Sequence, residues 1–148
     1  MKKLALTLFL TSVVGYAQID YDTLVKNLEE ITAKTDLPQF FEGLPYSGTN
    51  YTFYDDRFLR FYDVIIDEAQ IAYFVDELAI MITPFNKVED FNKIRSKLIE
   101  TYGAPELNDR GYSCDYRWDT NERSIVLSIN KIDGEFNTFE WFFITLHE

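Results

Sequence analysis

Cysteine, histidine and glycine are all scarce, with one Cys, one His and six Gly among 148 residues. With Cys114 alone, the chain cannot form an internal disulfide. Zinc sites need three or four closely spaced Cys, His or carboxylate ligands, and Cys114 and His147 belong to no such cluster. The glycines form neither a phosphate-binding loop nor a G-x-S-x-G elbow. The sequence therefore predicts no metal, no cofactor and no catalytic residues.

Positive charge is also scarce, because 14 Lys and Arg stand against 25 Asp and Glu, a net charge of −11. This charge opposes binding to a phosphate backbone, so nucleic acid is not expected as a partner. It favours attraction to cationic proteins. Acidic residues such as Asp115 and Asp119 lie close together in the sequence. Their spacing does not identify a pair of facing carboxylates as in a glycosidase, and it does not match the calcium-binding loop of an EF-hand.

No apolar run reaches the roughly 20 residues that a membrane-spanning helix needs. The apolar stretch 4–14 follows Lys2 and Lys3 and precedes small residues at Gly15 and Ala17, which is the pattern of a secretory signal peptide. We therefore expect a signal peptide over 1–17 and a single domain over 18–148. The mature chain is expected to be exported, periplasmic or extracellular, and free of a permanent membrane span. A buried N-terminal helix is the alternative interpretation.

Hydrophobic residues make up 47% of the chain and aromatic residues 17%, which is enough for a packed core. Apolar residues at helical spacing predict two amphipathic helices, one from Asp20 or Asp22 to Thr35 and one from Asn86 to Tyr102. Strands are expected within 51–66, where Asp55-Asp56 forms a turn, and at 70–75, 78–83, 112–119, 123–132 and 137–147. The predicted fold is α+β, in the order α-βββ-α-βββ, with an antiparallel sheet and both helices packed on one face.

The last predicted strand is apolar on both sides, because Phe139, Trp141 and Phe143 alternate with Phe142, Ile144 and Leu146. Either the aromatic loop 40–46 or the first half of the sheet covers the second set, or an apolar patch is left for a partner. The candidate binding residues are Phe139, Trp141, Phe142, Phe143, Asp115 and Asp119.

Several short motifs resemble small exported bacterial α+β domains of unassigned function. They are the hairpin Tyr73–Leu78, the helix stop Tyr102–Pro105, Trp118 and the strand segment Ile125–Leu127. The resemblance spans about 70–146, although Glu77 departs from the Asp-Gly turn that is common in that group. The order of helices and sheet is also similar to that of a secreted beta-lactamase inhibitory protein. These likenesses imply architecture and no activity.

The sequence thus predicts a non-enzymatic binding module of the bacterial cell envelope that engages a basic protein, such as a cationic enzyme or toxin. Two alternatives stay open. One is a carboxylate-dependent hydrolase that acts on envelope polysaccharide, and the other is a purely structural accessory domain. The oligomeric state is not predicted.

Overall fold

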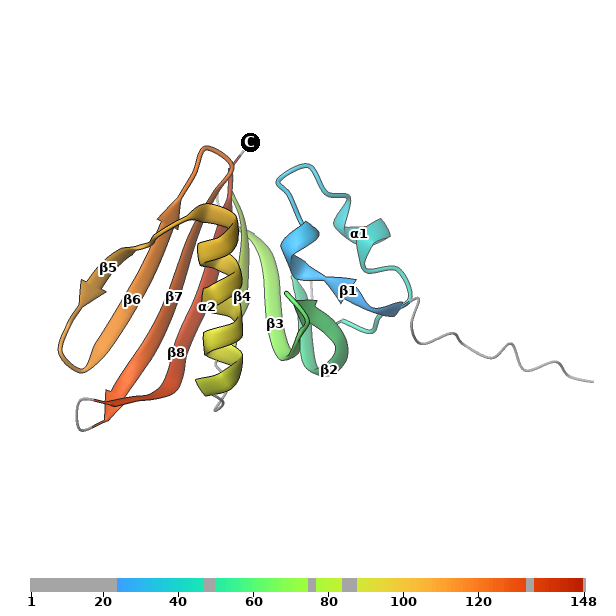
Figure 1. The fold of residues 1–148 in the computed structure, drawn as a ribbon. Helices are drawn as coiled ribbons and strands as arrows, with labels where there is room; N and C mark the ends of the chain where they lie inside the picture. The colour runs from blue at the N-terminus through green and yellow to red at the C-terminus, as the bar shows by residue number, and fades with distance from the viewer. Residues whose placement is uncertain (1–23, 47–49, 75–76, 84–87, 133–134, 148) are drawn as a thin grey trace, which may run out of the picture.

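The computed structural model describes residues 24–46, 50–74, 77–83, 88–132 and 135–147. Eight strands form one sheet in the order β1-β2-β3-β4-β8-β7-β6-β5 (Figure 1). Neighbouring strands are antiparallel, except that β1 and β2 run parallel. The strands are β1 (Lys26–Asn27), β2 (Tyr51–Phe61), β3 (Val64–Phe74), β4 (Glu77–Ile82), β5 (Glu106–Asp109), β6 (Ser113–Asp119), β7 (Arg123–Ile132) and β8 (Glu135–Leu146).

The predicted α+β fold with two amphipathic helices is wrong. In the described residues only α2 (Val88–Tyr102) exceeds one turn. The segment predicted as the first helix instead contains β1 and the 3₁₀ turn η2 (Leu28–Glu30), while its start at 20–23 lies outside the described residues. Leu28 and Ile31 are both fully buried. A 3₁₀ turn also places residues i and i+3 on one side, so the apolar spacing did not distinguish it from an α-helix.

A second short helix, α1 (Leu37–Phe40), follows the 3₁₀ turn. The Asp36 carboxylate caps it by accepting a hydrogen bond from the Gln39 backbone N–H at 3.2 Å. The loop after α1 packs on β2 through Phe41, whose ring centroid lies 4.8 Å from that of Phe53. The aromatic loop 40–46 therefore covers the first half of the chain and not β8.

The long extended segment 51–66 turns later than predicted. β2 passes through Asp55-Asp56, where its register with β3 shifts between Tyr54 and Leu59, as in a β-bulge. The tight turn lies at Tyr62 and Asp63, which both have positive φ, 46° and 65°. Such angles suit the two-residue turns that match strand twist.

The remaining predictions for the second half are largely confirmed. β3 and β4 form the expected hairpin, and α2 ends before Gly103, whose φ of 85° terminates the helix. β7 has the predicted bounds, and β6 and β8 differ from prediction by one or two residues. β5 was not predicted. The expected cap Asn86 lies outside the described residues.

One face of the sheet carries the core and α2. The Phe91 ring of α2 contacts Tyr116 of β6, with ring centroids 5.6 Å apart, and the Trp118 indole N–H donates to the Gly103 carbonyl at 2.8 Å. The register aligns Tyr116, Leu127 and Phe142 across three strands of this face, and all three are buried. Figure 1 shows α2 in front of β4 and β8. We call this the helix-covered face, and the opposite side the open face.

Candidate functional site

The open face presents a row of partly exposed side chains. By register, Thr52, Gln70, Met81, Phe143 and Val126 lie side by side on β2, β3, β4, β8 and β7. All five are half-buried. Phe91 of α2 and Phe41 after α1 pack on the other face, so these helices leave this row uncovered.

A groove of about 280 Å³ lies at the β2–β3–β4 end of this row. Tyr54 and Glu68 are directly opposite each other in the β2–β3 register, and the Tyr54 side chain is 67% exposed. Among the described residues, the Glu68 carboxylate has no ion pair. The groove is lined by Thr52, Tyr54, Glu68, Gln70, Met81, Ile82 and Thr83.

The structure separates the six predicted binding residues. Phe142 is 1% exposed and belongs to the core, where its ring centroid lies 4.8 Å from that of Phe61. Phe143 is half-buried on the open face, next to Met81 in the register. Phe139 and Trp141 lie in β8 opposite Ile129 and Ser128, but their side chains are outside the description.

The two predicted aspartates have different environments. Asp115 is 5% exposed and accepts hydrogen bonds from Arg110 at 2.6 Å, Ser128 at 2.5 Å and Asn108 at 3.3 Å. Asp115 is therefore a buried, fully engaged side chain of β6. Asp119 is exposed and pairs with Arg117 at 3.1 Å. Both carboxylates have partners, so neither is placed as a free catalytic acid.

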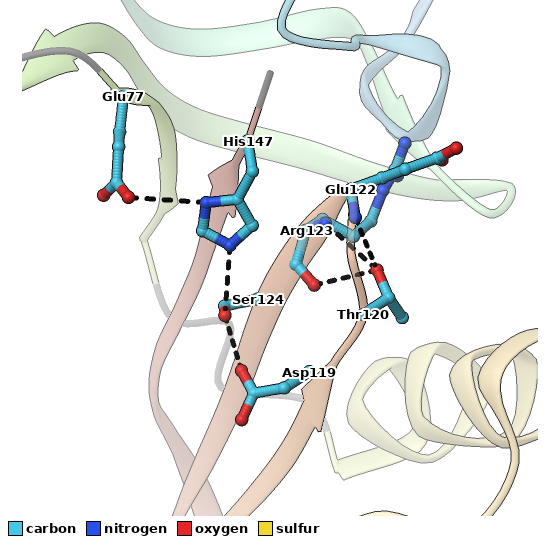
Figure 2. A network of polar contacts seen from close by, with 7 residues as sticks. All are labelled: Glu77, Asp119, Thr120, Glu122, Arg123, Ser124 and His147. Carbon is cyan, nitrogen blue, oxygen red and sulfur yellow. Dashed lines mark hydrogen bonds and ion pairs between the residues drawn. The ribbon is translucent and has the colours of Figure 1, made fainter.

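A chain of polar contacts joins the ends of four strands, β4, β8, β7 and β6 (Figure 2). His147 Nδ1 lies 3.4 Å from Glu77 Oε1, and His147 Nε2 lies 3.4 Å from Ser124 Oγ. The Ser124 hydroxyl donates to Asp119 Oδ1 at 2.5 Å. This network could not be predicted from the sequence, because it depends on the pairing of β8 with both β4 and β7.

Glu77, His147 and Ser124 have the residue types of a Ser-His-acid triad. Ser124 Oγ also lies 2.5 Å from Asp119 Oδ1, so His147 is not the only hydrogen-bond partner of this serine. The network links the end of β8 to β4, β7 and β6.

A second cavity, of about 350 Å³, lies beside this network. One wall is the turn after η2 and the other is the β6–β7 turn with the end of β8. The Thr120 hydroxyl shapes the β6–β7 turn, since it accepts from the Glu122 and Arg123 backbone N–H groups at 3.2 and 3.0 Å (Figure 2). The cavity is lined by Thr32, Ala33, Lys34, Asn121, Glu122, Arg123 and His147.

Three further titratable groups, Cys114, Glu29 and Asp109, have pKa values that their surroundings shift. Burial is the main cause that raises the pKa of the Cys114 thiol, which disfavours the reactive thiolate. Burial also raises the pKa of Glu29, despite backbone hydrogen bonds that lower it, and Glu29 Oε2 has no hydrogen-bond partner among the described residues. The hydrogen bond from Lys131 is the main cause that lowers the pKa of Asp109.

No group of three or more His, Cys, Asp or Glu in the described part of the chain is placed to hold a metal ion. None of the helices within the described ranges combines the length and the hydropathy that crossing a lipid bilayer requires. Comparison with known protein families, with curated proteins and with solved structures finds no match for this chain.

Proposed function

We propose that this chain is an exported, non-enzymatic binding module of the bacterial cell envelope, and that it engages a basic protein through the groove on its open face. Export is supported by the charged, apolar and small-residue segments of 1–17. The net charge of −11 supports attraction to a cationic partner.

The observation that carries the proposal is the chemistry of the groove. Glu68 supplies a carboxylate without an ion pair among the described residues, and Tyr54 opposite it supplies an exposed aromatic ring. Met81 supplies apolar surface to the groove, and Phe143 lies next to Met81 in the register. A lysine or arginine side chain can lay its aliphatic stem on such a surface and place its cation against the carboxylate and the ring.

The test uses a fluorescent lysine-rich peptide, with anisotropy measured as salt is raised. We expect binding that weakens with salt, because ions screen exposed charges over roughly 8 Å at physiological ionic strength. Glu68→Gln should weaken binding about fivefold, which corresponds to the ~1 kcal/mol of a close charge pair in water. Tyr54→Ala should also weaken it. Glu89→Gln on α2 is the matched control, because it removes the same charge from an exposed position on another element.

Equal losses for Glu68→Gln and Glu89→Gln would overturn the proposal, since the attraction would then come from net charge alone. Binding that is insensitive to salt would also overturn it. A glutamate-rich peptide should not bind to any of these variants.

A further inference from the structure

The cavity between the N-terminal segment and the β6–β7 turn gathers positive charge in a chain of opposite net charge. Lys34, Arg123 and His147 all line it, and Glu122 is the single carboxylate among its lining residues. Two basic side chains, Lys34 and Arg123, therefore face the one carboxylate of Glu122, so basic groups outnumber acidic ones in the lining. We propose that this cavity binds a small organic carboxylate.

The first support is the state of the two cations. Lys34 and Arg123 have no carboxylate partner among the described residues. Acidic residues outnumber basic ones in this chain, so a basic side chain could readily find a carboxylate partner. Lys34 and Arg123 share a cavity without one, and an external anion could therefore bind to them. Five other described cations lie within 3.4 Å of a carboxylate oxygen, namely Lys93, Lys97, Arg110, Arg117 and Lys131. Within the described ranges, Lys26, Arg57, Arg60 and Arg95 do not, but none of these four lines the cavity.

The second support is how Arg123 is held. Its Nη1 donates to the Glu29 backbone carbonyl at 3.3 Å. This neutral partner holds the guanidinium without neutralising it. A guanidinium has five N–H donors in a planar fork, which suits a carboxylate. The contact to Glu29 leaves further donors for a ligand.

The third support is the size and the polar lining of the cavity. A volume of about 350 Å³ lies at the small end of the range for ligand pockets. The Thr32 hydroxyl and the Asn121 amide add neutral hydrogen-bonding groups. This site is separate from the open-face groove, so each proposal can fail without the other.

The chain contains a single histidine, which gives the experiment a built-in probe. The imidazole proton resonances of His147 would be followed by NMR at fixed pH and ionic strength while sodium benzoate is added. Benzamide, which has the same shape without the charge, is the control ligand. We expect a saturable shift with benzoate and none with benzamide.

Lys34→Gln tests the charge at an exposed position where folding should be unaffected. It should weaken benzoate binding tenfold, which is about 1.4 kcal/mol. Arg57→Gln is the matched control, because Arg57 is exposed, carries no ion pair among the described residues and does not line the cavity. Arg123→Gln should weaken binding further, with circular dichroism to verify the fold. Equal responses to benzoate and benzamide, or equal affinities of the Lys34 and Arg57 variants, would overturn the proposal.

Discussion

Phe61 and Phe142 meet edge to face, with ring centroids 4.8 Å apart and ring planes at 86°, although β3 and β4 lie between their strands in the sheet order. Two side chains on non-adjacent strands can touch in this way only when the sheet curls around its own core. The contact therefore joins the first and second halves of the chain into one hydrophobic cluster.

Replacement of Phe142 by Ala should lower the free energy of unfolding by about 3–5 kcal/mol, because it leaves a cavity in this cluster. Phe143→Ala should lower it by only roughly 1–2 kcal/mol, since that ring is half-buried at the open face. Urea denaturation of the two variants makes the comparison. Similar losses would mean that the two rings are equally buried.

The two aspartates of β6 should differ in the same assay. Asp115→Ala removes the acceptor of three hydrogen bonds, including one from buried Ser128, and should cost about 2–3 kcal/mol. Asp119→Ala breaks an exposed pair with Arg117 and should cost no more than ~1 kcal/mol. A larger loss at Asp119 would contradict the assignment of Asp115 as the structural residue.

Glu29 should make stability depend on pH in a predictable direction. Its pKa is raised above the ordinary 4.5, chiefly by burial, so the folded state holds this proton more tightly than the unfolded state. The resulting stabilisation is complete below pH 4.5 and is lost as pH rises through the higher pKa of the folded state.

Glu29→Gln keeps an oxygen acceptor but cannot ionise. Its free energy of unfolding, relative to wild type, should therefore rise between pH 4 and pH 7, as measured by urea denaturation at both values. Asp119→Asn, which alters an exposed carboxyl, serves as the control. A difference between Glu29→Gln and wild type that does not change with pH would contradict the predicted direction.

Gly103 ends α2 with a φ of 85°, and a Cβ built there meets no atom within 4 Å. Gly103→Ala should therefore cost about 1 kcal/mol through backbone strain alone, because L-residues disfavour this conformation. Gly103→Asn should cost less, since Asn adopts it more readily. Thermal denaturation can rank the two variants. Equal stability of Gly103→Ala and wild type would show that the helix end relaxes into another conformation.

α2 could be predicted from the sequence because Phe91, Ile94 and Leu98 recur at intervals of three and four residues, which places them on one face of a helix, and all three are buried. The N-terminal segment could not, because Leu28 and Ile31 fit a single 3₁₀ turn as well as a helix. β5 has a single hydrophobic residue, Leu107, which is too few to show the alternation of a strand. Local patterns thus identified α2 and the strands of the second half, but they misplaced the turn between β2 and β3 and missed the short elements.

The candidate sites were harder to predict than the fold. A turn was expected at Asp55-Asp56, so the pairing of Tyr54 with Glu68 was not predicted. These two residues line the groove. The cavity needs the N-terminal segment to meet residues 121–123, which are far away along the chain. Among the predicted binding residues whose side chains the structure describes, Phe143 is the one that lies in the open-face row, next to Met81.

The two outermost strands decide how this sheet behaves at high concentration. β1 has only two residues, and β5 has four exposed ones that include Glu106 and Asp109. Short or charged margins are poor templates for backbone pairing with another molecule. These edge strands therefore disfavour the addition of strands from other molecules, and so the formation of fibrils by this aromatic-rich sheet.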